Sequence, residues 1–128
     1  MCTALTLRSW FPNWRQPLVD QVPVLDARLS AAAAFVRPGS TVADIGCDHG
    51  KLSAYLAAAK NCQVIAADIR PAPLARARET MLRYGCAQRV ECRLGDGLSV
   101  LSAGEAQTVV IAGVSGITAC DIVEACPF

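Results

Sequence analysis

The sequence predicts a single α/β domain in which helices cover both faces of a parallel sheet. Short apolar segments alternate with alanine-rich or amphipathic segments along the chain, which is typical of parallel strands joined by helical crossovers. A length of 128 residues suits one domain. With 53% hydrophobic and 18% charged residues, the composition also argues against a disordered chain.

The N-terminal segment differs from the rest of the chain. It contains several prolines and a close group of large aromatic side chains, namely Pro12, Pro17, Pro23, Trp10, Phe11 and Trp14. We therefore expect an irregular N-terminal arm over residues 1–24 and the folded domain over residues 25–128. The aromatic group either packs on that domain or docks on another surface, and the sequence leaves both interpretations open.

Helix and strand signals then follow one another along the chain. Residues 25–36 carry apolar side chains at helical spacing, and Pro38 with the glycine after it ends that helix. Residues 41–46 form an apolar run that enters a glycine turn, as a buried parallel strand does. Pro71 suits the first turn of a later helix, and Gly85 suits the position just after its end. The predicted strands are 41–46, 63–68, 90–93 and 108–112, and the predicted helices are 25–36, 51–60, 71–84 and 117–125.

The charge balance excludes one class of protein. A net charge of +1 does not suit a nucleic-acid binder that works by bulk electrostatics, and 5% aromatic residues are few for a base-stacking platform. A local basic cluster is still present, because six arginines face only Glu79 and Glu91 over one stretch. This cluster is either a solvated helix face or a patch that contacts RNA phosphates. Its arginines are Arg70, Arg76, Arg78, Arg83, Arg89 and Arg93.

The seven cysteines do not predict a metal site. None of them forms a C-x-x-C pair, so we expect reduced, mostly buried thiols and no bound metal. No apolar run reaches the roughly 18 residues of a membrane span, and the N-terminus lacks the pattern of a signal peptide. We therefore expect a cytoplasmic protein that does not associate with membranes.

Acidic residues end three successive strands, at the edge where open α/β sheets bind ligands. The first strand runs into Asp44-Ile45-Gly46-Cys47-Asp48-His49-Gly50, where Gly46 permits a sharp turn and Gly50 a close approach to a ligand. This is not the G-x-G-x-x-G pattern, and two carboxylates beside the loop would repel a pyrophosphate. The loop instead suits a ligand with a cationic end, such as the amino and sulfonium groups of S-adenosylmethionine.

The second and third acids suit the other half of such a ligand. Asp68 follows Gly46 at the distance where a carboxylate accepts hydrogen bonds from ribose hydroxyls, and Ile69 can lie against an adenine face. Asp96, with Gly97 beside it, is placed to accept from the adenine amine. His49 is either a helix-entry residue or part of the pocket. A nicotinamide-dependent oxidoreductase is the weaker alternative, because the motif for its cofactor is missing.

These motifs resemble those of class I S-adenosylmethionine-dependent methyltransferases. The segments VADIGCDHGKLSAYL (42–56), GDGLSVL (95–101) and TVVIAGVSG (108–116) are similar to the bacterial tRNA (adenine-N1)-methyltransferase family. The resemblance implies a Rossmann-like sheet of strand order 3-2-1-4. It also implies S-adenosylmethionine as cofactor, tRNA as substrate, and a cofactor site formed by Asp44, Gly46, Asp48, His49, Gly50, Asp68, Ile69, Asp96, Gly97 and Gly113.

The same resemblance implies a reaction, and the family motifs can be compared with those of this chain. Transfer to N1 of an adenine gives the product a positive charge, and Asp48 is the candidate catalytic residue that would relieve it by taking a proton. The family usually has Ala-Tyr after the histidine and G-M-G-G in the turn, whereas this chain has Gly50-Lys51 and Gly113-Val114-Ser115-Gly116. We expect a domain truncated after about four strands, self-association through an exposed fourth strand, and, as an alternative to an enzyme, a cofactor-binding module without turnover.

Overall fold

The computed structural model describes residues 22–112 and 115–128. Most of the expected arm, residues 1–24, lies outside this part of the chain, and so does Gly113. Of the arm, only 22–24 is described, and Pro23 in it is fully buried. None of the helices in the described ranges has the length and apolar character needed to cross a membrane. The same ranges hold no cluster of three or more side chains suited to binding a metal ion.

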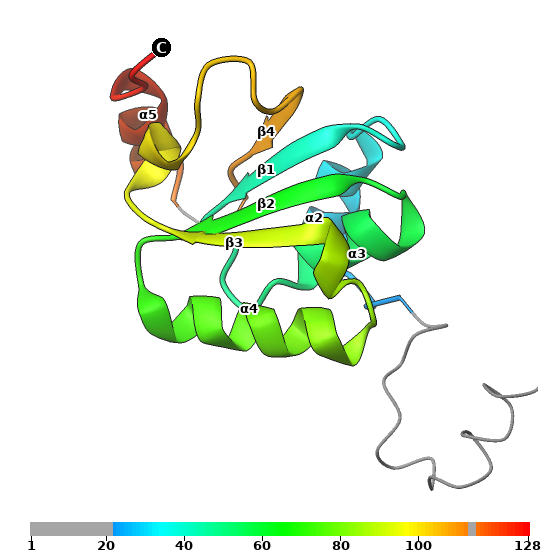
Figure 1. The fold of residues 1–128 in the computed structure, drawn as a ribbon. Coiled ribbons are helices and arrows are strands. Elements are labelled where there is room, and N and C mark those ends of the chain that lie inside the picture. The colour runs from blue at the N-terminus through cyan, green and yellow to red at the C-terminus, as the bar shows by residue number, and fades with distance from the viewer. Residues whose placement is uncertain (1–21, 113–114) are drawn as a thin grey trace, which may run out of the picture.

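The sheet has four parallel strands, as predicted (Figure 1). In chain order these are β1 (Thr41–Ile45), β2 (Gln63–Asp68), β3 (Val90–Leu94) and β4 (Thr108–Val110). Their order across the sheet is β3-β2-β1-β4, which confirms the expected order. In the register, Ala43 lies opposite Ile65 of β2 and Val109 of β4. The two most buried strands, β1 and β2, are therefore the two central ones.

Helices cover both faces of this sheet (Figure 1). One face carries α2 (Ala27–Ala34), α3 (Lys51–Ala59) and α4 (Pro71–Arg83), and the other carries the 3-10 helix η3 (Gly97–Val100) and α5 (Gly116–Glu124). A second 3-10 helix, η2 (Ala87–Arg89), leads into β3. The helix that joins β1 to β2 is α3, and the helix that joins β2 to β3 is α4. Both lie on the same face of the sheet, because crossover connections between parallel strands share one handedness.

The core divides between the two faces because successive strand residues point to opposite sides. Val42 and Val64 point toward the three-helix face, where they pack with Leu52, Leu56 and Met81. Ala43, Ile45, Ile65 and Ala67 point to the other face, where they pack with Leu98 and Leu101. Cysteines contribute to this packing as small apolar side chains. Among the described ones, all free, Cys47, Cys62 and Cys86 are buried, Cys92 and Cys126 are half-buried, and Cys120 is exposed.

Several element boundaries differ from the prediction by one or two residues, and two of these differences have a visible local contact. The first helix begins at Ala27 rather than residue 25, because the Asp26 side chain caps it by accepting the Leu29 N–H at 2.8 Å. The last strand ends at Val110 rather than residue 112. Beyond that residue the Ala112 carbonyl accepts from the Arg28 guanidinium of α2 instead of from the sheet. The exposed edge expected at the fourth strand is present among the described strands, and Val109 on it is 41% exposed.

One ion-pair network fastens the long segment between β3 and β4. Arg93 of β3 donates to both carboxylate oxygens of Glu105, at 2.8 and 2.6 Å, and to the Val100 carbonyl at 2.8 Å. Glu105 in turn accepts the Ser102 N–H at 3.0 Å. The segment is thereby held over the face that carries η3. The guanidinium holds the pKa of Glu105 down at about 2, because its hydrogen bonds stabilise the carboxylate.

Candidate functional site

Two adjoining hollows open at the carboxyl ends of the strands, where the sequence predicted a site. The β1 hollow has a volume of about 260 Å³ and is lined by Asp26, Arg28, Leu29, Asp44, Gly46, Cys47, Asp48, His49, Lys51, Leu52 and Ala112. The β2 hollow has a volume of about 270 Å³ and is lined by Ile45, Gly46, Ala67, Asp68, Ile69, Arg70, Gly95, Asp96, Gly97, Thr118 and Ile122. Gly46 lines both hollows, so they flank the turn that follows β1.

Asp44 is the buried acid of the β1 hollow. It lies in β1 with only 2% of its surface exposed, and Ser53 of α3 donates a hydrogen bond to its Oδ2 at 2.7 Å. Burial raises the pKa of Asp44 to about 6; the Ser53 hydrogen bond opposes this rise and the neighbouring Asp68 charge adds to it. Because the Asp44 carboxylate accepts a hydrogen bond from Ser53 and has little contact with solvent, a cation that enters the hollow would stabilise its charged form.

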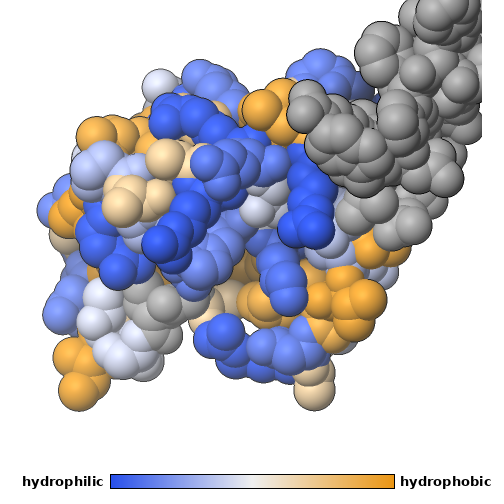
Figure 2. Space-filling view, turned by 90° about the horizontal axis from the view of Figure 1, so that it is seen from below, coloured by the Kyte–Doolittle hydropathy of each residue, from blue (hydrophilic) through white to orange (hydrophobic). Residues whose placement is uncertain are grey.

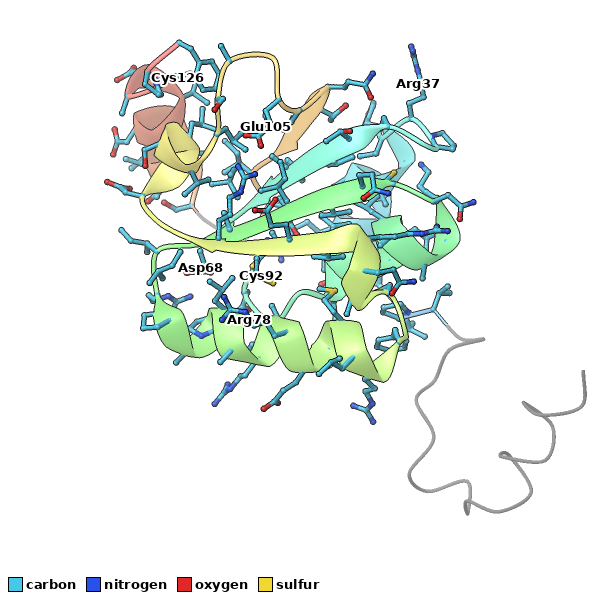
Figure 3. The ribbon with its side chains drawn as sticks, in the orientation of Figure 1. Arg37, Asp68, Arg78, Cys92, Glu105 and Cys126 are labelled. Carbon is cyan, nitrogen blue, oxygen red and sulfur yellow. The ribbon has the colours of Figure 1, made fainter. Side chains whose placement is uncertain are left out.

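Asp68 is the buried acid of the β2 hollow, at the end of β2. Its Oδ2 accepts the Asp48 N–H at 3.2 Å, and its Oδ1 accepts the Arg70 N–H at 3.0 Å. The Arg70 Nε lies 3.5 Å from the same Oδ1. Two backbone donors from different loops therefore fix the orientation of this carboxylate, and Oδ2, which accepts one bond, keeps acceptor capacity for a ligand hydroxyl. Figure 3 shows Asp68 at the end of β2.

The loop after β1 connects the two acids through an unusual backbone conformation. Gly46 turns the chain with φ of +74°, and its N–H with that of Cys47 bonds the Ala67 carbonyl. Asp48 adopts φ of +52°, in the left-handed region that a residue with a side chain enters at a cost of about 1–3 kcal/mol. The hydrogen bond from its N–H to Asp68 holds it there. Its own side chain is 60% exposed at the mouth of the β1 hollow.

His49 is held by α4. The Arg76 Nη1 lies 3.1 Å from the His49 Nε2, and Thr80 Oγ1 donates to the His49 carbonyl at 2.7 Å. Because an arginine side chain only donates, this contact gives Nε2 the acceptor role. The Asp48 Oδ1 lies 3.7 Å from the same nitrogen. The sequence left open whether His49 belongs to the pocket, and the structure places it on the wall of the β1 hollow.

Gly50 has a role other than the one predicted. We expected its missing side chain to let a ligand approach, but Gly50 lines neither hollow. It begins α3 with φ of +77°, and a Cβ placed on it would lie 2.9 Å from the Ala77 Cβ and 3.1 Å from the Ala77 Cα of α4. The glycine is therefore required by the close packing of α3 against α4.

The remaining predicted residues lie in the β2 hollow. Asp96 and Gly97 line it after β3, and Ile69 lines it beside Asp68 with 61% of its surface exposed. Thr118 and Ile122 of α5 close it from the opposite side. The structure thus brings together every predicted site residue that it describes except Gly50.

Several lining residues were not found from the sequence. Thr118 and Ile122 lie four apart on α5, so helical spacing offered a signal for them. Arg28 offered no such signal, because its guanidinium meets the Ala112 carbonyl 84 residues away in the sequence. Cys47 also lines the β1 hollow, but burial beside Asp44 raises the pKa of its thiol far above the usual range. Cys47 is therefore a wall of the hollow rather than a nucleophile.

Comparisons with known proteins show the family to which the chain belongs. A family described as "Methyltransferase domain" matches residues 25–127. The tRNA (adenine(22)-N(1))-methyltransferase of Bacillus subtilis (strain 168) is 35% identical over 102 residues, which are 79% of this chain and 43% of that protein. The chain therefore spans less than half the length of this curated relative.

Solved structures share the fold. The crystal structure of the B. subtilis M1A22 tRNA methyltransferase TrmK matches with a TM-score of 0.75 and 34% identity, over 80% of this chain and 44% of that one. TrmK of M. capricolum, in complex with S-adenosyl-homocysteine, matches with a TM-score of 0.72 and 28% identity, over 79% and 46%. These matches agree with the Rossmann-like fold expected from the sequence.

Proposed function

The chain belongs to the methyltransferase-domain family, and from that premise we propose that its two hollows together bind S-adenosylmethionine for methyl transfer to N1 of an adenine in tRNA. The observation that carries the proposal is the pair of buried carboxylates, Asp44 and Asp68, on either side of Gly46. The names of the relatives support the choice of tRNA and of adenine N1.

The residues present fit this cofactor. The buried carboxylate of Asp44 suits the amino group, and the oriented oxygens of Asp68 suit the ribose hydroxyls. Exposed Ile69 offers an apolar surface for adenine, and Asp96 accepts from the adenine amine. When bound, the cofactor supplies an electrophilic methyl group on a sulfonium. No metal ligand is needed for any of these contacts.

The chain's own groups then position the acceptor and manage the charge. Adenine N1 has a free lone pair, so the site needs no base before the transfer. Methylation leaves a positive charge on the base, and the exposed Asp48 carboxylate at the mouth of the β1 hollow is the group we assign to accept the N6 proton. Arg28 donates to the carbonyl of Ala112, which lines the β1 hollow.

The test begins with calorimetric titration of S-adenosylhomocysteine into the chain. We expect saturable binding by the wild type and none by Asp68→Ala, with Arg78→Ala as the matched control that binds normally. Absence of binding by a folded wild type would refute the cofactor site. Transfer of labelled methyl from S-adenosylmethionine to an unmodified tRNA transcript tests the reaction itself. Binding without transfer would instead support the alternative of a module without turnover.

Two further parts of the proposal concern place and assembly. A tRNA substrate places the reaction in the cytoplasm. The edge of β4 offers unpaired backbone groups and a 41% exposed Val109 among the described strands, which favours self-association through strand pairing. Sedimentation velocity over a range of concentrations tests this, and a monomer at every concentration would refute it.

A further inference from the structure

The arginine cluster noted in the sequence divides into separate groups in the structure. Arg89 donates to the Asn61 side chain and to the Ala57 carbonyl, and Arg93 belongs to the network with Glu105. Arg70 lies beside Asp68. Arg70 and Arg93 thus pair with carboxylates, and Arg89 bonds two oxygen acceptors of the fold, so we exclude these three from a patch. The three arginines that remain lie on α4, and they lie on two different flanks of it.

The two flanks follow from helix geometry. Leu74, Ala77 and Met81 define the buried side of α4. At 100° per residue, Arg76 and Arg83 lie on one flank of that side, and Arg78 lies on the other. The contacts agree, because Arg76 meets His49 of the loop before α3, whereas Arg78 lies on the β3 side. There, burial raises the pKa of the Cys92 thiol, and the charge of Arg78 opposes this rise. Figure 3 shows Arg78 near Cys92.

The flank with Arg76 leads into the functional site. Arg76, Thr80 and Arg83 form one stripe along α4, which we call the α4 ridge. Its first two members contact His49, and His49 lines the β1 hollow. Lys51, exposed at the start of α3, lines the same hollow and adds a cation at this end. Hydrophilic residues extend across much of the face that carries α4 (Figure 2).

The ridge holds charge that the described part of the chain does not neutralise. Among the described residues, no carboxylate lies within ion-pair distance of Arg76 or Arg83. The single acid of α4, Glu79, follows Arg76 by three residues and precedes Arg83 by four, so it lies on their side of the helix, but it forms no ion pair with either of them in the described part of the chain. Both arginines are exposed, and they lie about 10 Å apart along the helix axis. Two guanidinium groups at that spacing match separate phosphates of one nucleic-acid strand.

We propose that the α4 ridge binds backbone phosphates of the RNA next to the nucleotide that enters the β1 hollow. The proposal rests on the proposed function, since it assigns a phosphate contact surface to the same tRNA substrate. Arg76 binds the phosphate nearest the hollow, and Arg83 binds one farther along the strand. The weak net charge of the chain fits this assignment, because a short stripe adds a local contact without a basic surface overall.

The experiment measures how RNA affinity depends on salt. Fluorescence anisotropy with a fluorescein-labelled, unmodified tRNA transcript is recorded over a series of KCl concentrations. The slope of log K against log salt is negative, and each lost phosphate contact reduces its magnitude by about 0.7–0.9. We therefore expect Arg76→Ala and Arg83→Ala each to reduce the magnitude by about 0.8, and the double variant by about 1.5. Arg78→Ala, the matched control on the other flank, leaves the slope unchanged, and Arg76→Lys retains it.

The outcomes separate this proposal from the proposed function. S-adenosylhomocysteine titrations of the wild type and of Arg83→Ala run in parallel. If the wild type binds S-adenosylhomocysteine but the ridge variants keep the wild-type slope, the ridge proposal alone is overturned. If Arg78→Ala changes the salt slope as much as the ridge variants do, the ridge proposal is overturned too, because the attraction to RNA then comes from overall charge and not from the ridge. The ridge proposal is also overturned if the ridge residues are needed for binding to anionic lipid vesicles and the chain does not bind tRNA. If the slopes change as expected but S-adenosylhomocysteine does not bind, the ridge stands and the cofactor assignment fails.

Discussion

Replacing the buried acid of the β1 hollow should stabilise the fold while removing its function. Burial raises the pKa of Asp44 from 3.8 to about 6, so the native state binds this proton more tightly than the unfolded chain does. Stability therefore falls as the pH rises from about 4 to about 6, and the full cost is present above that window. Since a tenfold change in proton affinity corresponds to about 1.4 kcal/mol, ionised Asp44 costs the native state about 3 kcal/mol at pH 8.

Asp44→Asn removes the charge and keeps the shape. Its amide oxygen can still accept from Ser53, which lies 2.7 Å from the carboxylate oxygen. We expect the free energy of unfolding at pH 8 to rise by about 3 kcal/mol, and the difference between variant and wild type to vanish near pH 4. Urea unfolding at both values measures it, and other titrating groups cancel in the comparison. The variant should no longer bind S-adenosylhomocysteine.

A matched variant tests the cause. Ser53→Ala removes the one side-chain hydrogen bond that lowers the pKa of Asp44, so it should destabilise the chain more at pH 8 than at pH 4. The reasoning is refuted if Asp44→Asn is less stable than the wild type at pH 8. It is also refuted if the two proteins differ by the same amount at both pH values, because the effect is then unrelated to ionisation.

Three other predictions concern packing, a loop and the reaction. Gly50→Ala should destabilise the chain by about 1–3 kcal/mol in urea unfolding, and by more than Gly39→Ala, which shares the positive φ but meets nothing within 4 Å; equal losses would rule out the contact with α4. Glu105→Gln should lower the melting temperature at neutral pH by removing the ion pair with Arg93, and this deficit should shrink as the pH falls from 4.5 toward about 2. Asp48→Asn should bind S-adenosylhomocysteine normally but methylate tRNA more slowly, and an unchanged rate would exclude the assigned proton transfer.

The fold could be predicted where local patterns decide it. The second strand was expected over residues 63–68 and is observed as Gln63–Asp68. A short, continuous apolar run is typical of a parallel strand that is buried on both faces, so the run itself marks the strand. The start of α2 and the end of β4 could not be predicted in the same way. The start of α2 depends on the Asp26 side chain that caps the helix, and the end of β4 lies beside a hydrogen bond from Arg28 to the Ala112 carbonyl. Neither contact has a signature in the spacing of apolar residues.

The site was predictable to the extent that sheet topology fixes it. Asp44 and Asp68 meet because the carboxyl ends of parallel strands share one edge. Arg28 could not be anticipated, since its position depends on how α2 packs over the sheet. The arginine cluster was ambiguous for the same reason. Sequence proximity grouped six arginines, but the structure places Arg93 in the Glu105 network, Arg70 beside Asp68 and Arg89 against Asn61, and it divides the other three between two flanks of α4.

The position of β1 in the sheet also has a consequence for how the chain folds in time. One neighbour of β1 is β2, which follows after a single helical crossover. The other neighbour is β4, where Thr108 lies opposite Val42, so the paired residues are 66 positions apart in the sequence. Parallel pairings of such long range close slowly, because loop entropy is lost before the contact forms. A chain emerging from the ribosome can therefore assemble β1, β2 and β3 with their helices first. Until residue 110 has been synthesised, one side of its central strand remains open to competing partners.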